Sequence, residues 1–509
     1  MKKHKISYSD TQSFSKIIQM YTEEKVSEKF YNRYPNINQF EDQIKEKQSS
    51  NIDRNLLYEV IKNQNFKLQL SEKTIQNIDL LKSKKSFTIT TGHQLCLFTG
   101  PLYFIYKIIS AINLSKQLTQ SFPENNFIPI FWMASEDHDF EEINHINLFG
   151  KKYHWKTKQS GIVGDFNTSG IDDVIDEIEE DLAESKNLKK IIQTFRECYS
   201  AKNLSESIRL LVNKLFGKYG IVVLDANDKK LKEKLIPIIK EDVVNQNLHS
   251  IISERTEELS DEFKSQAFVR NINFFNISEG KTEKITKKVS EDKIENNPET
   301  FSPNVLIRPL YQELILPNIA YIGGGAEISY WMQLKTVFKY LSISFPILVL
   351  RNSVMWIEEK DFKKWTKLGL KMSDIFRSTD DLYKKFILDK SNVNLYLEKK
   401  KIEDIYRDLQ KKTSDISLKQ FIRSDEMKQI RSLEKLEKRL IKLEKENHEI
   451  SINQINKIKN KLFPNNVLQE RSDNMIAFYL NHGNRFIETL IKEINPLDTN
   501  FLILSPERN

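Results

Sequence analysis

The sequence contains very little cysteine, glycine or proline. Its two cysteines, Cys96 and Cys198, are too few for a disulfide framework or a structural zinc site, which is typical of a protein from a reducing compartment. Only 14 glycines and 13 prolines occur among 509 residues. A short segment that holds two glycines and a proline therefore marks a turn of interest.

Long apolar runs are also missing. No stretch approaches the roughly 18 uninterrupted apolar residues of a membrane span, and the first segment, MKKHKISYSD, lacks the apolar region of a signal peptide. We therefore expect a cytoplasmic protein without a membrane partner.

Charge of one sign is not concentrated anywhere. Lysine and arginine number 78 against 71 acidic residues, a net charge of +7, and both signs alternate along the chain, as in EKLEKRLIKLEKE. Binding along a phosphate backbone requires a face of one sign, so the sequence argues against nucleic acid as a partner.

Strand patterns followed by helix patterns indicate an α/β core. Short β-branched and aromatic runs predict strands at 86–90, 127–133, 221–226 and 345–353, each near a helical pattern. Such units predict a mostly parallel, doubly wound sheet. We place this core at 86–389, after N-terminal helices at 1–85 that pack on it, with insertions near 150–200 and 265–320.

After residue 390 the sequence pattern predicts long helices. Leu436, Leu440, Leu443, Asn447 and Ile450 alternate at spacings of four and three, which predicts a coiled-coil arm over 390–463. A shorter helical stretch at 395–409 and a polar break at 413–417 favour an antiparallel hairpin. Residues 464–509 then return to the core as helix and a short strand.

The segment TGHQLCLFTGPLYFI, at 91–105, joins a strand to a helix through a glycine turn. Ligands bind at such junctions because the first amides of the helix are unpaired. His93 and Gln94 could contact a phosphate or carboxylate there, although His93 could equally well only cap the turn. Gly92 and Gly100 shape the turn, and Cys96 is better explained as a small buried residue than as a nucleophile.

An acidic cluster follows the second buried strand. Glu136, Asp137, His138 and Asp139 lie at the same edge of the predicted sheet as the glycine turn. Carboxylates and an imidazole in that place can act as a general base, an amine anchor or metal ligands. A metal site is the less favoured version because the spacing matches no common metal motif, and a solvated acidic loop stays open as an alternative.

A second glycine turn, Gly323 to Gly325, precedes Glu327 and Tyr330. It matches no complete nucleotide-binding pattern, but three glycines usually mark a close backbone approach. Arg308 and Arg351 flank this region. Each could bind an anionic group or form a structural ion pair.

These motifs, with LRNS and LQER further along, occur in the order TGHQLCLFTGPLY, FWMASEDHDF, RPLYQELILPNIAYIGGGAEISYWMQL. Together they resemble the BshC family, the cysteine-adding ligases of bacillithiol biosynthesis, over essentially the whole chain. The chain departs from the family pattern at His93, where many members have Gln, at Cys96, where a small residue is common, and at Gly325 and Ala326, where Pro-Gly is usual.

The resemblance implies a nucleotidyltransferase-like Rossmann core with two inserted segments and a coiled-coil arm that mediates a homodimer. It also implies addition of L-cysteine to glucosaminyl-malate. A carboxylate does not acylate an amine unaided, so ATP or another nucleotide is expected to be coupled, with a metal requirement left open. The acidic cluster would bind the amine, with Asp137 or His138 accepting its proton, while Arg351 and Lys107 would balance substrate carboxylates.

The site residues expected from these arguments fall into three groups: catalytic His93, Glu136, Asp137 and His138; substrate-binding Gln94, Tyr103, Lys107, Asp139, Glu327, Tyr330 and Arg351; and nucleotide-binding Gly92, Gly100, Gly323, Gly324 and Gly325. Two other functions fit the same turns: a nucleotidyltransferase acting on a small molecule, and a non-catalytic nucleotide-binding scaffold. A scaffold has no reason to bring 91–101 and 136–139 into one cleft.

Overall fold

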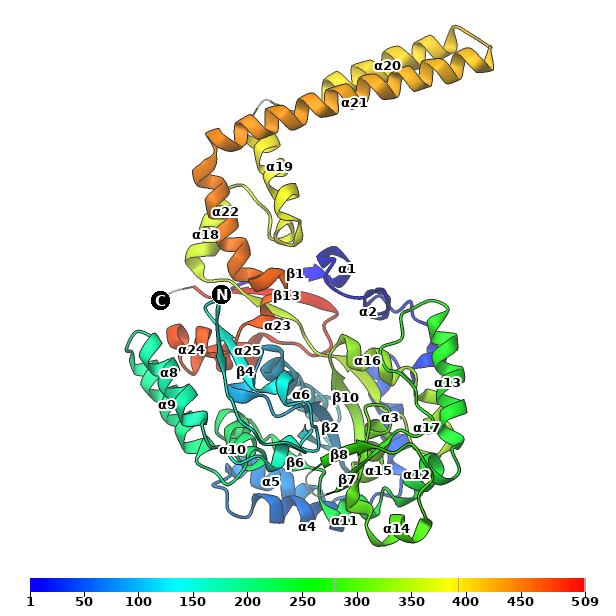
Figure 1. Cartoon of the computed structure of the whole chain (residues 1–509), viewed down its shortest axis with the longest axis vertical. Helices are drawn as coiled ribbons and strands as arrows, with labels where there is room; N and C mark the ends of the chain where they lie inside the picture. Colours follow the sequence, from blue (N-terminus) through cyan, green and yellow to red (C-terminus); the bar gives the residue numbers. More distant parts are fainter. Residues whose placement is uncertain (279–280, 392, 508–509) are drawn as a thin grey trace.

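A five-stranded parallel sheet forms the centre of the computed structural model, which describes residues 1–278, 281–391 and 393–507 (Figure 1). The strands are β2 (Ser86–His93), β3 (Asn126–Met133), β6 (Val222–Asp225), β10 (Asn318–Gly323) and β11 (Ile347–Leu350), and they pair in the order β11-β10-β2-β3-β6. All four pairings are parallel. This confirms the predicted doubly wound sheet. Strand β10 was not expected from the sequence, which indicated only the glycine turn at its end.

The strand order is that of a Rossmann fold. Strand β2 lies in the middle of the sheet. Strands β3 and β6 extend the sheet from β2 toward one edge, and β10 and β11 extend it toward the other edge. The direction in which strands are added to the sheet therefore reverses between β2 and β10. In open α/β sheets ligands bind in the crevice outside the strand ends at this switch point.

Both faces of the sheet are buried, because successive side chains of a strand point to opposite faces and each face is covered by helices. In β3, Ile128 and Ile130 pack against one group of helices, while Phe131 and Met133 pack against another. The first group includes α2 (Lys16–Thr22), α4 (Arg54–Asn65) and α13 (Asn247–Ser260), and the second includes α6 (Tyr103–Ser121), α9 (Lys186–Tyr199) and α10 (Leu204–Phe216). The period-two pattern of these strands therefore creates two cores.

A second sheet joins the two ends of the chain. It consists of β1 (Lys2–Ser7), β13 (Asn500–Ser505) and β12 (Val354–Trp356), with β1 antiparallel to β13. The expectation of helices for 1–85 holds for α1 (Tyr8–Thr11), α2, α3 (Phe40–Gln48), α4 and α5 (Glu72–Leu80), but it is wrong for residues 2–7. That strand exists because Ile6 pairs with Phe501, a partner that no local pattern reveals.

Two long connections carry additional elements. Between β3 and β6 lie α7 (Phe140–Ile143), β4 (His145–Leu148), β5 (Lys151–His154), α8 (Ile171–Asp181), α9 and α10. Between β6 and β10 lie α11 (Lys229–Glu233), α12 (Ile236–Ile239), a π-helical turn (Lys240–Val244), α13, β7 (Phe274–Ser278), β8 (Lys281–Lys284), α14 (Glu291–Asn296), β9 (Phe301–Pro303) and α15 (Arg308–Ile315). After β10 come α16 (Gly325–Trp331) and α17 (Lys335–Tyr340).

A helical arm projects from the body of the molecule (Figure 1). It is built from α18 (Glu359–Lys367), α19 (Thr379–Lys390), α20 (Tyr396–Lys411), α21 (Ile416–Asn447) and α22 (Glu449–Leu462). As expected, α20 and α21 form an antiparallel hairpin, in which the Tyr406 hydroxyl donates to Asp425. The two long helices of the arm, α21 and α22, are separated by a break at His448, which lies within the apolar repeat from Leu436 to Ile450.

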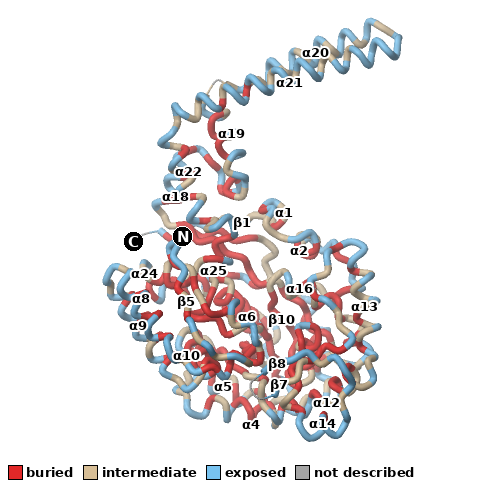
Figure 2. The backbone as a smooth tube through the Cα atoms, in the orientation of Figure 1, coloured by how far each residue is buried: buried red, intermediate tan, exposed pale blue. Residues whose placement is uncertain are grey.

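The apolar stripe of α21 is only partly covered within the chain. The pairing with α20 ends near Glu437, which Lys399 contacts at 2.9 Å. Leu436 remains 48% exposed and Leu443 remains 60% exposed. Most of the hairpin surface is exposed (Figure 2).

The chain returns to the body through three short helices, α23 (Gln469–Ser472), α24 (Ile476–His482) and α25 (Arg485–Glu493), before β13. Over the described part of the chain, no helix combines the length and the apolar character that a membrane crossing demands.

Candidate active site

A cavity of about 750 Å³ lies outside the ends of β2, β3 and β10, at the switch point of the sheet. Of the residues expected in the site, those that line it are Gly92, His93, Gln94, Tyr103, Lys107, Glu136, Asp137, His138, Glu327 and Tyr330. Those that do not line it are Gly100, Asp139, Gly323, Gly324, Gly325 and Arg351. The turn after β2 and the acidic cluster after β3 therefore share one cleft.

Gln94 joins two carboxylates on the acidic side of the cavity. Its amide nitrogen donates to Asp137 at 3.0 Å and to Glu142 at 2.7 Å. Burial by itself raises the pKa of Asp137, but the charge of Arg308 and the hydrogen bonds from Gln94 and two backbone amides bring it below its usual value. Asp137 is thus ionised and can hold an amine. Glu142 was missed from the sequence because it lies beyond the EDHD cluster.

Glu136 is fixed by a buried lysine. Lys232, in α11, forms an ion pair with Glu136 and donates to the carbonyl oxygen of Phe301 at 2.6 Å. The Lys232 side chain is fully buried, so its charge is compensated only by these partners. Nothing in the sequence distinguishes this lysine from the many others.

His138 lies at the open side of the cavity. It is exposed, and its ring centre is 5.3 Å from that of Phe275 in β7. A substrate can therefore reach the imidazole, which keeps it available for proton transfer.

Lys107 and Glu327 form an ion pair across the switch point. Lys107 also donates to the Gly92 carbonyl at 2.9 Å, while Glu327 accepts from the Tyr321 hydroxyl at 2.6 Å. Burial lowers the pKa of Lys107, and Glu327 offsets part of this effect. The positive charge expected to balance a substrate carboxylate is therefore already paired inside the protein.

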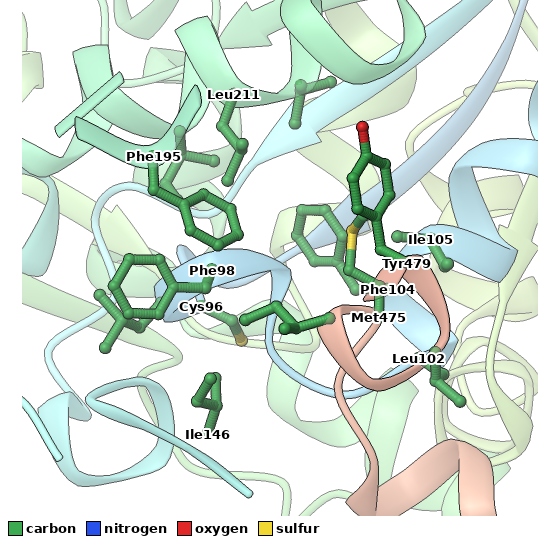
Figure 3. Close-up of a cluster of buried hydrophobic side chains, with 14 of the residues drawn as sticks. Cys96, Phe98, Leu102, Phe104, Ile105, Ile146, Phe195, Leu211, Met475 and Tyr479 are labelled. Carbon is green, nitrogen blue, oxygen red and sulfur yellow. The ribbon is translucent and has the colours of Figure 1, made fainter. Parts of the chain in front are cut away.

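His93 is a neutral, packed residue. Burial, and after it the charge of Lys107, lowers its pKa to about 3. Its ring packs 5.4 Å from that of Tyr103, and its Nδ1 atom lies 3.6 Å from the sulfur of Cys96. Cys96 points into an apolar cluster with Phe98, and burial raises the pKa of its thiol to about 12 (Figure 3). This confirms the interpretation of Cys96 as a small buried residue.

Several backbone amides of the glycine turns already donate to groups within the protein. In the turn after β2, Phe98 donates its backbone N–H to the Tyr199 hydroxyl, Gly100 to Leu97, and Leu102 to Asp473. These three N–H groups are therefore not available to a phosphate, which binds to unpaired amides.

In the turn after β10, the backbone N–H of Gly324 donates to Glu327 at 2.7 Å. A carboxylate thus occupies the place where a phosphate was expected. Gly100 has a different role: its φ is +57°, and a Cβ there would lie 2.6 Å from that of Cys96. This glycine permits close packing of the turn.

Arg351 lies behind the cavity wall. Its guanidinium binds Glu470 and sits 5.2 Å from the centre of the Tyr103 ring. The sequence left two roles open for Arg351, binding of an anionic group or a structural ion pair, and the structure shows the ion pair. Glu470 belongs to the LQER motif, and its neighbour Gln469 bonds both backbone groups of Trp356 in β12.

Within the described ranges, no three histidine, cysteine or acidic side chains are grouped so that they could hold a metal ion. The polar groups of the cavity instead divide into an acidic wall and a set of basic side chains.

Comparison with known proteins gives one consistent family. Residues 1–352 match the family described as "Bacillithiol biosynthesis BshC, N-terminal Rossmann-like domain", and residues 354–506 match "Bacillithiol biosynthesis BshC, C-terminal coiled-coil domain". A protein from Flavobacterium johnsoniae named "Putative cysteine ligase BshC" is 40% identical, over 98% of this chain and 99% of its own. Proteins of the same name from Flavobacterium psychrophilum and Bacillus anthracis are 41% and 30% identical, over 98% and 84% of this chain and 98% and 86% of their own.

Proposed function

The chain belongs to the BshC family of bacillithiol biosynthesis, a family of cysteine ligases, and from this premise we propose that it joins L-cysteine to glucosaminyl-malate through an amide bond. This reaction would be the last step of the synthesis. The observation that supports it best is the pair of carboxylates, Asp137 and Glu142, held by Gln94 inside the cavity. Such a pair suits a protonated amine, which is the group that must be acylated.

The proposed chemistry at the amine needs two steps. Asp137 and Glu142 first hold the ammonium group of the glucosamine. Loss of one proton to Asp137 or His138 frees the nitrogen lone pair, which attacks the carbonyl carbon of the activated cysteine carboxylate. The C–N bond forms as the bond from that carbon to the activating group breaks, the activating group leaves with the electron pair, and the second nitrogen proton passes to water. Glu136, fixed by Lys232, keeps a negative charge near the amine throughout.

The acyl side of the reaction needs an activated carboxylate. A coupled nucleotide, ATP in the simplest case, would supply that activation. Because the backbone N–H groups of Gly100 and Gly324, which were expected to bind it, donate to groups within the protein, we assign no residue to it.

The shared cavity argues against a non-catalytic scaffold but not against a nucleotidyltransferase. A scaffold has no need for the shared cavity of Gln94 and Asp137, so the enzyme is favoured. A nucleotidyltransferase would use the same cavity but would leave the nucleotide on its product, which the ligase does not.

We further propose a cytoplasmic homodimer formed through the arm. The exposed apolar side chains of α21, including Leu436 and Leu443, are what a second helical arm would cover. The free, buried Cys96 and Cys198 suit a reducing compartment.

The experiment is deletion of the gene in its host, followed by labelling of thiols and separation by mass. Loss of bacillithiol with accumulation of glucosaminyl-malate is expected. Unchanged bacillithiol would contradict the proposal. Incubating the purified protein with both substrates and a nucleotide, and identifying the product by mass, separates the ligase from the nucleotidyltransferase.

A further inference from the structure

Two arginines of the cavity have no protein partner. Arg270 and Arg308 both line it, and neither guanidinium makes a hydrogen bond or an ion pair with any residue that the structure describes. Arg270 only stacks over the Phe275 ring, 5.4 Å from its centre. Lys107 and Arg351, by contrast, are each matched to a carboxylate. Arg308 lies near enough to Asp137 to lower the pKa of that carboxyl, but neither Arg308 nor Arg270 is in a direct ion pair within the described residues, so both guanidinium groups are available to a ligand.

A buried amide network holds these two arginines in fixed places. The backbone N–H of Arg270 donates to the Asn273 side chain at 3.2 Å, and Asn273 in turn accepts from the Asn304 side chain at 3.0 Å. The carbonyl of Asn304 accepts from the backbone N–H of Arg308 at 2.9 Å. Asn273 and Asn304 are 1% and 7% exposed, so these bonds are shielded from water.

The network is anchored on the core of the second connection. Both the backbone and side-chain N–H groups of Asn273 donate to Asp242, which lies in the π-helical turn and is fully buried. Single π-helical turns are frequent at functional sites. The loop before β7 and the start of α15 are thus tied together, and each presents one arginine to the cavity.

We propose that Arg270 and Arg308 bind the two carboxylates of a dicarboxylate group, which in the proposed function is the malate part of the acceptor. The assignment rests on that function for the identity of the substrate. A guanidinium fork matches a carboxylate with two parallel hydrogen bonds, so two arginines match a dicarboxylate in charge and in geometry. The acceptor then lies with its amine at Asp137 and Glu142 and its acidic end at the arginines.

Charge favours a dicarboxylate over a polyphosphate. Asp137 and Glu142 line the same cavity and, unlike Glu136 and Glu327, form no ion pair with a lysine, so they would repel a triphosphate, whose charge also exceeds that of the two arginines. A dicarboxylate brings only the charge that Arg270 and Arg308 can neutralise. Free L-cysteine carries a single carboxylate and would leave one arginine unpaired.

The test is calorimetric binding of glucosaminyl-malate, glucosamine and ATP to the full-length protein and its variants. R270Q and R308Q should each weaken glucosaminyl-malate about tenfold or more, because each removes a charge-assisted pair. R308K, which keeps the charge but loses the fork, should fall between R308Q and the wild type. Binding of glucosamine, which has no malate, should not change. R423Q, at an exposed arginine of α21, is the matched control and should bind like the wild type.

Three binding results would overturn the assignment of Arg270 and Arg308. Folded R270Q and R308Q that bind glucosaminyl-malate within twofold of the wild type would overturn the assignment, as would a loss of ATP binding in place of malate binding. A wild type without affinity for glucosaminyl-malate would also overturn it. Arginine-dependent malate binding without any cysteine adduct would leave the assignment standing and contradict the proposed function instead. Thermal unfolding of each variant identifies one that has merely lost its fold.

Discussion

Arg351 donates hydrogen bonds of 2.7 and 3.0 Å to the two carboxylate oxygens of Glu470. The two residues are 5% and 1% exposed, so both charges are withdrawn from water. Glu470 also accepts from the backbone N–H of Val354 in β12. One bidentate ion pair therefore fastens the segment that follows the arm to the end of the central sheet, directly behind Tyr103.

Removing one member of this pair should be costly. We expect R351M to lower the free energy of unfolding by about 3–5 kcal/mol, because it leaves the buried Glu470 carboxylate uncompensated. R351M/E470M should lose less than the sum of the single variants. The measurement is urea denaturation followed by circular dichroism. K411M, which breaks the exposed pair with Asp408, should cost less than about 1 kcal/mol. Additive losses at Arg351 and Glu470 would contradict the coupling.

The turn after β2 should tolerate no side chain at position 100. Gly100 has a φ of +57°, and an added Cβ would lie 2.6 Å from the Cβ of Cys96. We expect G100A to lose roughly 2–5 kcal/mol through backbone strain and overpacking. G150A is the matched control, because Gly150 has a φ of +86° with no atom within 4 Å, so only the strain applies. Equal melting temperatures for the two variants would show that the contact with Cys96 does not matter.

Local pattern predicted four of the five strands of the central sheet, all but β10, and it did not predict the partners that complete the site. Strand β3 was recognisable because a short β-branched run is buried on both faces and precedes a polar turn. Strand β1 was not, since Ile6 pairs with Phe501 at the other end of the chain. The folding of the second connection brings Lys232 to Glu136 and Arg270 to the cavity, so neither residue is marked by its neighbours in sequence.

The stability of the protein should depend on pH through His93. Its pKa is about 3 in the folded state against 6.5 for a free histidine, so below pH 6.5 the unfolded chain binds a proton that the folded chain does not. Folding is therefore weakened as pH falls from about 6.5 toward 3, by up to about 1.4 kcal/mol per pH unit. H93Q should lack this contribution, so its free energy of unfolding should fall less steeply between pH 6.5 and 4.5. H448Q, on the arm, should follow the wild type. Parallel curves for H93Q and the wild type would mean that His93 titrates normally.

Activity should depend on His138. We expect H138A to fold like the wild type, because the side chain is exposed, and to lose about 10²–10⁴-fold in the rate of ligation through loss of a proton acceptor. H448A serves as the control outside the cavity. The rate of product formation at saturating substrates is the measurement. An unchanged rate in H138A would leave Asp137 as the acceptor.

The arm offers a direct test of pairing between chains. Leu436 and Leu443 lie one heptad apart on α21 and are 48% and 60% exposed in the single chain. If a second copy covers them, L436E/L443E places two charges in an apolar seam, which should convert a dimer to a monomer in sedimentation analysis. The folded body should be unaffected, because α21 contributes little to it. R423Q again provides a surface control on the same helix. A wild type that sediments as a monomer at micromolar concentration, or a double variant that stays dimeric, would place the contact elsewhere or remove it.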